Sequence, residues 1–399
     1  MTDIAVIGGG ASGLAAAVAA ARAGACVTVC ERGKRVGKKI LATGNGRCNM
    51  TNTGASIDDY HGHDTAFMEH AISTFWVGET LDLFSELGIL PRFEENGKVY
   101  PYSQTASSVL DVLRRETDRL GVETLCGFDV SSAEKRGHCF TVSAYDGRVC
   151  KAKRVIIACG GKAAPDLGSN GSGYELLSSF GHRITPLSPS LVQIRTEQDT
   201  VRKLKGIKLD ARVTVNGRSE TGELLFTDYG LSGPPVFSVS SYIDGADKVS
   251  LDIMPEYSFS DIYTILTDRR RTLGWVPLED FFTGMLNKRV GQALLKSVGA
   301  APLSREAKTI SDSELKRIVS AIKSWDFRIE GTKSWNNAQV TRGGAETKDF
   351  DPVTMESRLA KGLYACGEVL DIDGDCGGYN LQWAWSSGYI AGNAAASVK

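Results

Sequence analysis

Three glycines near the start of the chain have the spacing of a phosphate-binding turn. Gly8, Gly10 and Gly13 follow a short apolar run and precede an alanine-rich stretch. In such a turn the first glycine permits the sharp bend, the second lets the backbone approach a pyrophosphate, and the third lets the next helix pack closely. We expect Ala11 and Ser12, at the start of that helix, to present free N–H groups to the phosphates.

An acidic residue ends the second apolar run. Glu31 follows Val27–Cys30, about 20 residues after the glycine turn, where a carboxylate accepts both hydroxyls of an adenosine ribose. A 2′-phosphate would be repelled there, so FAD or NAD fits this position better than NADP. We expect Arg32 to contact the same cofactor. This order of elements predicts a dinucleotide site; an ordinary βαβ unit with a glycine-rich turn is the alternative.

The C-terminal part of the chain indicates that the dinucleotide is FAD. Gly367 and Glu368 follow an apolar run at 363–366, and flavoproteins with one Rossmann domain end such a run with Gly-Asp. The acid hydrogen-bonds a ribityl hydroxyl, and here glutamate takes its place. The last helix begins just beyond, and its positive end stabilises negative charge at flavin N1 and the C2 carbonyl. The expected flavin contacts at this helix start are Gly378, Tyr379, Asn380 and Leu381.

A second glycine-containing turn follows the apolar run 155–159. Its Gly160 and Gly161 resemble the Ala-Thr-Gly-Gly-like motif of flavoproteins, with Cys159 in place of threonine. The alternative is a buried strand that ends in a Gly-Gly turn. We expect Gly160, Gly161 and Val130 to contact the cofactor.

The loop directly after the adenosine acid is the most distinctive run of the sequence. It combines glycines, cations, amides and hydroxyls, which can wrap a pyrophosphate and reach a flavin ring. Its expected cofactor contacts are Lys38, Lys39, Thr43, Gly44, Asn45, Gly46, Arg47, Cys48 and Asn49. For Cys48 a packing or flavin-contact role is favoured over that of a nucleophile.

Several of these motifs resemble those of one known family. The runs that carry the resemblance are Thr43–Asn49, Val99–Pro101, Leu225–Pro234, Gln339–Gly344 and Gly377–Ala384. They resemble those of the bacterial flavoproteins named for aminoacetone oxidase, which include a 3-dehydro-bile-acid Δ4,6-reductase and belong to the superfamily with two dinucleotide-binding domains. The resemblance implies an FAD domain, an inserted β-barrel-like domain and a small helical cap. Position 228, often histidine in the family, is Asp228 here, which puts a proton-transfer role at that position in doubt.

The composition along the chain divides it in the same way. Strand-like runs replace the βαβ pattern after Pro186, and helical spacing follows from 258. We therefore predict an α/β fold with a Rossmann-like FAD domain at 1–188 and 345–399. The inserted β domain takes 189–257 and 325–344, and the helical domain takes 258–324. Within the FAD domain, apolar spacing predicts helices over 65–88 and 105–120.

The bulk composition excludes several classes of protein. Of the 399 residues, 42% are hydrophobic and 23% charged, and the net charge is −1, which gives no sign of a nucleic-acid or anionic-membrane partner. Nine cysteines without a Cys-x-x-Cys pair favour a reducing cytoplasm and no structural metal. Without an apolar span of membrane length, we expect no membrane partner. The oligomeric state is left open.

The motifs together predict an FAD-dependent oxidoreductase. The leading hypothesis is hydride transfer from reduced FAD to an activated C=C bond, such as that of a 3-oxo-Δ4 steroid or bile-acid enone. No second Gly-x-Gly-x-x-Gly follows, so NADH or NADPH would dock transiently as the electron donor. We expect an apolar small-molecule substrate. The candidate proton donors are Tyr379, Tyr229 and Tyr100, since phenols hold their proton at neutral pH; each has a buried structural tyrosine as its alternative.

The sequence leaves two other functions open. One is an amine or aminoketone oxidase that passes electrons to oxygen. The other is a non-catalytic or RNA-modifying flavoprotein, against which the near-neutral charge speaks.

Overall fold

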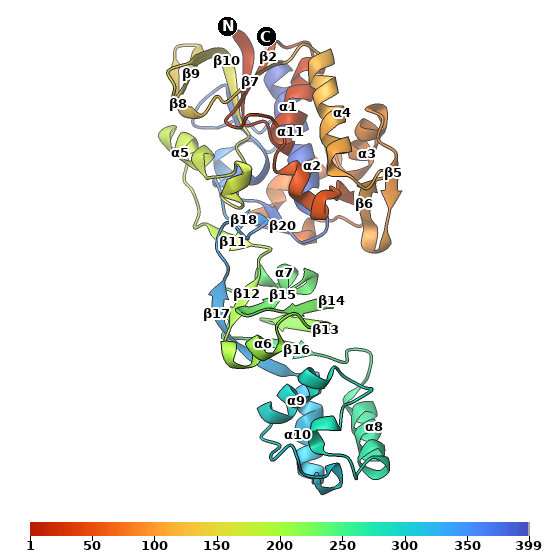
Figure 1. Ribbon diagram of the computed structural model, residues 1–399. Coiled ribbons are helices and arrows are strands. Elements are labelled where there is room, and N and C mark those ends of the chain that lie inside the picture. The colour runs from red at the N-terminus through yellow and green to blue at the C-terminus, as the bar shows by residue number, and fades with distance from the viewer. Residues whose placement is uncertain (398–399) are drawn as a thin grey trace. The chain divides into compact units, whose positions relative to one another are not determined.

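The computed structural model describes residues 1–397 and divides into two units (Figure 1). The first unit joins the two ends of the chain: Met1–Ser190 and the residues from Trp335 onward. The second unit is Leu191–Ser334. The first boundary falls close to the composition change after Pro186. The finer division into three domains stays a prediction.

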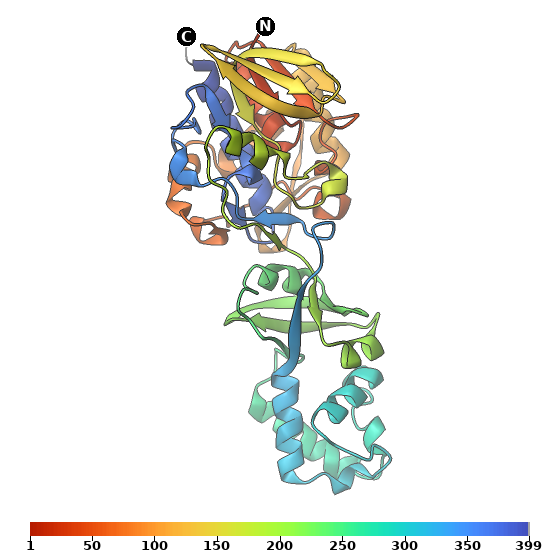
Figure 2. The same cartoon turned by 90° about the vertical axis from the view of Figure 1, so that its left-hand side faces the viewer.

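Within residues 1–397, a seven-stranded sheet forms the centre of the first unit, in the order β7-β2-β1-β10-β9-β8 with β19 beside β10. β1, β2, β7, β10 and β19 pair in parallel, whereas β8 and β9 pair antiparallel at one end. The bounds are β1 (Thr2–Ile7), β2 (Val27–Glu31), β7 (Glu123–Cys126), β8 (Val130–Arg136), β9 (Cys139–Ala144), β10 (Val149–Ile157) and β19 (Leu363–Ala365). This is the predicted Rossmann-like sheet, and β8 and β9 with the start of β10 form the yellow ribbon in Figure 2.

The first and last helices pack against each other through small residues. A Cβ at Gly388 would lie 2.4 Å from the Ser12 carbonyl oxygen, and one at Gly392 would lie 2.3 Å from that of Ala16. Glycine at these positions therefore permits the close approach visible in Figures 1 and 2. The helices of this unit are α1 (Ala11–Arg22), α2 (Glu69–Thr74), α3 (Val77–Glu86), α4 (Ala106–Arg119), α5 (Ser172–Ser179) and α11 (Tyr379–Ser397).

The helix predicted over 65–88 is wrong as a single element. Residues 65–68 form a 3-10 turn, α2 follows, and the chain becomes extended at Phe75 before α3 begins. The break is stabilised from both sides. The Phe75 ring stacks on Tyr389 at 4.1 Å, and the backbone N–H of Trp76 donates to the Glu79 carboxylate at 2.8 Å. The helix predicted over 105–120 is confirmed as α4.

Further small sheets of two or three strands belong to the first unit. β20 pairs antiparallel with β4, β3 and β5 flank β6, and β11 pairs with β18. The bounds are β3 (Thr51–Asn52), β4 (Tyr60–His61), β5 (Pro91–Phe93), β6 (Lys98–Pro101), β11 (Ser188–Ser190), β18 (Val340–Arg342) and β20 (Asp373–Gly374).

The second unit contains a closed antiparallel barrel, in the order β12-β15-β14-β13-β16-β17, as predicted. The strands are β12 (Ile194–Thr196), β13 (Lys208–Val215), β14 (Arg218–Phe226), β15 (Gly230–Ser232), β16 (Lys248–Asp252) and β17 (Trp325–Thr332). The helices are α6 (Gln198–Leu204), α7 (Pro234–Ser240), α8 (Phe259–Thr272), α9 (Lys288–Ser297) and α10 (Asp312–Lys323). Capping boxes that begin at Ser258 and Ser311 fix the starts of α8 and α10.

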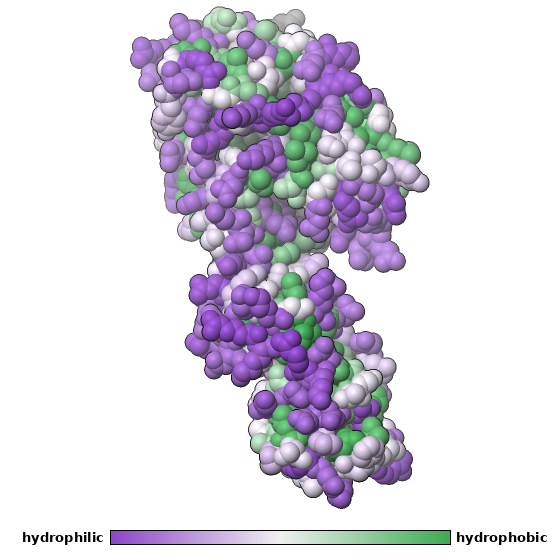
Figure 3. Space-filling model, viewed as in Figure 1, coloured by the Kyte–Doolittle hydropathy of each residue, from purple (hydrophilic) through white to green (hydrophobic). Residues whose placement is uncertain are grey.

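The surface carries mostly hydrophilic residues with scattered hydrophobic ones on the face shown in Figure 3. Among residues 1–397, no helix combines the length and apolar character needed to cross a membrane. The same residues contain no cluster of three or more histidine, cysteine, aspartate or glutamate side chains that could hold a metal ion.

Candidate dinucleotide site

The glycine turn between β1 and α1 has the geometry that its spacing predicts. Gly8 has φ +107°, and a Cβ there would lie 2.5 Å from the Ala158 carbonyl oxygen. A Cβ at Gly13 would lie 1.9 Å from the Gly8 carbonyl oxygen, so only glycine lets the helix approach the turn. At Gly10 a Cβ would meet nothing within 4 Å, and no side chain caps α1. The helix start is thus open to an anion.

Glu31 is fixed at the end of β2 by the backbone. Its Oε2 accepts a hydrogen bond from Gly9 N–H at 2.8 Å, and its Oε1 accepts one from Gly33 N–H at 2.6 Å. These bonds hold the carboxylate beside the glycine turn, where a ribose would lie. The neighbouring Arg32 forms an ion pair with Asp129 at 3.2 Å.

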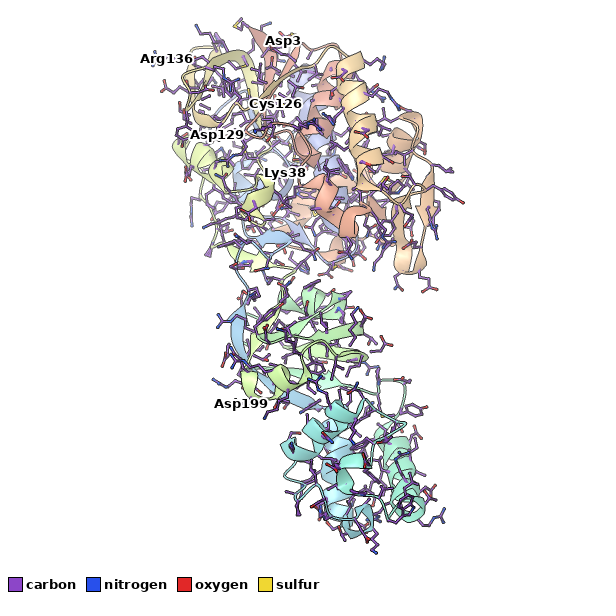
Figure 4. The ribbon with its side chains drawn as sticks, viewed as in Figure 1. Asp3, Lys38, Cys126, Asp129, Arg136 and Asp199 are labelled. Carbon is purple, nitrogen blue, oxygen red and sulfur yellow. The ribbon has the colours of Figure 1, made fainter. Side chains whose placement is uncertain are left out.

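A cleft opens at the carboxyl ends of these strands, the place where open α/β sheets bind ligands. Figure 4 labels two of its residues, Lys38 and Asp129, which come from different segments and lie on the first unit. The cleft is lined by Ile7, Gly8, Gly9, Gly10, Cys30, Glu31, Arg32, Gly37, Lys38, Lys39, Phe128, Asp129, Val130, Ala158, Cys159, Leu167, Gly168, Ser169 and Ser172. The sequence does not predict that Asp129 and the segment 167–172 line this cleft. For that segment, the glycines of the run Gly168–Gly173, which favour a turn, were the available signal.

The Glu368 carboxylate lies between three separate parts of the first unit. It pairs with the Lys39 ammonium group at 3.0 Å and accepts a hydrogen bond from Thr341 N–H at 2.8 Å. A Cβ at Gly161 would lie 2.7 Å from Glu368 Oε1, so this glycine leaves room for the carboxylate. Gly160 has φ +68°, which glycine adopts without strain. Gly367 N–H donates to the Ser387 hydroxyl at 2.9 Å.

The loop after Glu31 is built on left-handed backbone. Gly44, Asn45 and Gly46 all have positive φ, and Thr43 Oγ1 donates to the Ile40 carbonyl at 2.7 Å. Cys48 follows with φ 62° and is fully buried, and burial raises the pKa of its thiol to about 12. The thiol therefore keeps its proton at neutral pH, which agrees with a packing role.

The cations of this loop have protein partners. The Arg47 guanidinium pairs with Glu94 at 3.2 Å, donates to Gln104 at 3.0 Å and lies 4.1 Å above the Tyr100 ring centroid. Lys38 Nζ donates to the Asp166 carbonyl at 2.6 Å. Burial is the largest cause of the raised pKa of Tyr100, which also keeps its proton.

The start of α11 lies against the same loop. Gly378 has φ +105°, and a Cβ there would lie 2.6 Å from the Thr51 carbonyl oxygen. The Asn380 amide holds Gly374 from both sides, at 2.9 Å from its N–H and 2.6 Å from its carbonyl oxygen. Asn49 Oδ1 accepts from Val99 N–H at 3.1 Å. Leu381 is half-buried.

The three candidate tyrosines do not share one unit. Tyr379 and Tyr100 belong to the first unit, where the Tyr379 carbonyl accepts the Tyr60 hydroxyl at 2.9 Å. Tyr229 belongs to the second unit, and the Lys333 ammonium group lies 4.3 Å from its ring centroid. The proton-donor roles of all three stay predictions.

The residues present fit an FAD molecule. An uncapped helix start with an open glycine suits a pyrophosphate, and a carboxylate fixed at the end of β2 suits the adenosine ribose. A second carboxylate, Glu368, lies directly after β19 beside these strand ends. Together, the fold and this cleft define the chain as an FAD-dependent oxidoreductase of the Rossmann type.

The chain belongs to the family described as HI0933-like protein Rossmann domain, whose model matches residues 2–394. The resemblance stated from the sequence motifs is confirmed by a full-length relative. The 3-dehydro-bile acid Δ(4,6)-reductase of Clostridium scindens is 42% identical over 99% of both chains.

The chain is also similar to a second full-length relative and to a solved structure. A ribosomal RNA dihydrouridine synthase of Haemophilus influenzae is 32% identical over 96% of both chains. The solved 3-ketosteroid Δ1-dehydrogenase from Sterolibacterium denitrificans matches with a TM-score of 0.51 over 100% of both chains at 13% identity, which supports the fold alone.

Proposed function

We propose that this protein saturates a C=C bond conjugated to a carbonyl group in a small apolar enone, a 3-oxo-Δ4 steroid or a bile-acid enone. NADH or NADPH is the electron donor. The observation that carries the proposal is the 42% identity, over nearly the full length, to a reductase whose name describes this reaction class. The cleft, whose residues fit FAD, supports the flavin chemistry that this reaction needs.

The chemistry of such a bond matches what the site can do. A conjugated carbonyl draws electrons from the double bond, so the β-carbon accepts a hydride and the α-carbon accepts a proton. FAD, when bound and reduced by the nicotinamide, would supply the hydride. The chain binds and orients the cofactor through Glu31 and the start of α1, and the start of α11 stabilises negative charge placed near it.

A second candidate substrate is a uracil ring in RNA. It is favoured by the relative named as a ribosomal RNA dihydrouridine synthase. The 5,6-double bond of uracil is also conjugated to a carbonyl, so the same hydride and proton transfers saturate it. The net charge of −1 favours the small molecule, because RNA-binding proteins usually carry a basic surface.

The experiment is an anaerobic assay of NADH and NADPH consumption by the FAD-loaded protein with a panel of substrates. The panel contains a 3-oxo-Δ4 steroid, a 3-oxo-Δ4 bile acid, a uridine-rich RNA and aminoacetone. We expect a steroid or bile-acid enone to give a product two hydrogens richer, detected by mass spectrometry.

The other substrates give distinct outcomes. Dihydrouridine formed in the RNA, with the enones unchanged, would establish the second candidate instead. Bleaching of the flavin by aminoacetone but by neither nicotinamide would establish an amine oxidase. The Glu31→Ala variant serves as the control for the cofactor, since it leaves two backbone N–H groups without their acceptor and weakens FAD binding.

A further inference from the structure

Asp373, on β20, is a buried acid without a hydrogen-bond partner. Its residue is 1% exposed, and neither carboxylate oxygen has a partner among residues 1–397. Buried carboxyl groups in proteins are nearly always hydrogen-bonded or paired, because an isolated charge is costly to bury. The exception therefore needs a reason. None of the other aspartates or glutamates in the described part of the chain has both carboxylate oxygens buried in this way.

The position of Asp373 relates it to the cofactor site. Its segment joins Glu368 to Gly378, and the sequence predicts that both of these residues contact the flavin. The pairing of β20 with β4 sets Asp373 opposite His61, and Asn380, in the first turn of α11, fixes the next residue, Gly374, from both sides. The backbone on which Asp373 stands is therefore rigidly connected to the start of α11.

Charged and titratable groups face Asp373 from several elements. His61 on β4 and Arg342 on β18 favour its charged form, whereas Asp371 and Glu368 on its own segment oppose it. Tyr174 on α5 is also near enough for its pKa to be raised by Asp373. Some of these neighbours are engaged elsewhere: His61 Nε2 contacts Asp375 at 2.7 Å, and Asp371 contacts His63 at 2.5 Å.

The balance of these effects favours the protonated carboxyl group. Burial is the largest cause, and it raises the pKa of Asp373 from the ordinary 3.8 to about 7. A carboxyl group that holds a proton near neutral pH can give it up in a reaction and regain it from solvent afterwards, which is the property of an efficient general acid.

We propose that the Asp373 carboxyl group is the proton donor of the reduction, a role that rests on the proposed function. The hydride comes from FAD that a nicotinamide dinucleotide has reduced, and it forms a C–H bond at the β-carbon. The C=C π bond breaks and its electron pair passes to the carbonyl oxygen as an enolate. Asp373 O–H then donates its proton to the α-carbon, and the resulting carboxylate takes a proton from water.

The test separates the two half-reactions by anaerobic stopped-flow measurement of flavin absorbance. In Asp373→Asn we expect NADH or NADPH to reduce the flavin at the wild-type rate. Reoxidation by the enone should be slower by about 10²–10⁴-fold, the usual contribution of a general acid. Asp375→Asn, which makes the same substitution two residues away, should keep both rates within about threefold. Asp373→Glu, which keeps a carboxyl group, should recover part of the lost rate.

Wild-type protein provides two readouts that need no variant. The rate of reoxidation by the enone should fall as pH rises through about 7, and it should be slower in D₂O than in H₂O. Both effects should be absent in Asp373→Asn.

A readout independent of activity is the pH dependence of thermal unfolding of the FAD-free protein. The folded pKa of Asp373 lies above its unfolded value, so its protonated form stabilises the fold at low pH. That stability is lost as pH rises from 3.8 toward about 7. Relative to wild type, Asp373→Asn should therefore become more stable as pH rises over this range.

The outcomes distinguish this inference from the proposed function. If wild type reduces enones and Asp373→Asn reoxidises at the wild-type rate, Asp373 is not the donor. If the variant instead binds FAD at least tenfold more weakly with unchanged half-reactions, Asp373 is a cofactor contact and the inference fails. If wild type reduces no enone, the proposed function fails and this inference fails with it.

Discussion

The Lys39 ammonium group and the Glu368 carboxylate form an ion pair at 3.0 Å, although they come from opposite ends of the chain. Lys39 lies in the loop after Glu31, and Glu368 lies shortly after β19. Both side chains are partly shielded from solvent, at 24% and 20% exposure, so the pair is less screened than one on the surface. The pair connects two segments that the sequence predicts to contact the same FAD molecule.

Replacing Lys39 should therefore weaken FAD binding. In Lys39→Met the Glu368 carboxylate loses its cation, and we expect the Kd for FAD to rise about tenfold and the free energy of unfolding to fall by about 1 kcal/mol. Fluorescence titration of the apoprotein measures the first effect and urea unfolding the second. Lys34→Met is the matched control, because Lys34 is exposed and is not among the residues that line the cleft, so it is expected to change both values less. Equal effects in the two variants would contradict a specific role for the Lys39–Glu368 pair.

Two glycines of the turn should respond to alanine in different ways. Gly10→Ala places a methyl group in open space, so the apoprotein should keep its thermal midpoint while FAD binding weakens, because the methyl group blocks the pyrophosphate. Gly13→Ala places the methyl group 1.9 Å from the Gly8 carbonyl oxygen, so the midpoint should fall as well. Differential scanning fluorimetry with and without FAD distinguishes the two. Undiminished FAD affinity in Gly10→Ala would rule out a pyrophosphate at this turn.

Much of the site could be predicted from the sequence because its signals are local. The glycine turn, Glu31 and the open start of α1 follow from residue types at fixed spacing, and the structure arranges them as that spacing requires. Other features depend on distant contacts. The Phe75–Tyr389 stack interrupts a helix that looks continuous in the sequence, and Glu94 pairs with Arg47, which the sequence predicts to contact the cofactor. The importance of Asp373 arises from its burial, which no local pattern encodes.

Alkylation of the folded protein should distinguish the buried Cys48 from the exposed Cys26. Cys48 is fully buried, and burial raises the pKa of its thiol to about 12, so iodoacetamide at pH 7.5 should leave it unmodified. Cys26 is exposed and should react within minutes under the same conditions. Peptide mass spectrometry after quenching gives the extent at each site. Comparable labelling of both residues in the folded protein would contradict the buried position of Cys48.

The free energy of unfolding should depend on pH partly through Glu116, a buried acid on α4. Glu116 accepts hydrogen bonds from Arg119 and Arg22, and these partners lower its pKa from 4.5 to about 2. A lowered folded pKa means that its charged form stabilises the fold above pH 4.5 and that this stability is lost as pH falls toward 2.

Glu116→Gln should therefore reduce the free energy of unfolding by roughly 2–3 kcal/mol at pH 7, and by progressively less as the pH is lowered. Urea unfolding at a series of pH values measures the difference. Glu86→Gln, whose side chain is 63% exposed, should change it by less than about 1 kcal/mol. A loss in Glu116→Gln that is the same at pH 3 and pH 7 would show that the charge of Glu116 does not stabilise the fold.

The most direct measurement of the central claim is an anaerobic single turnover. Protein loaded with one equivalent of FAD is reduced by one equivalent of NADH or NADPH, and a 3-oxo-Δ4 steroid or bile acid is then added without oxygen. We expect the oxidised flavin spectrum to return at the same rate as a product two hydrogens richer than the substrate appears. A flavin that stays reduced until oxygen is admitted, with the enone recovered unchanged, would contradict it.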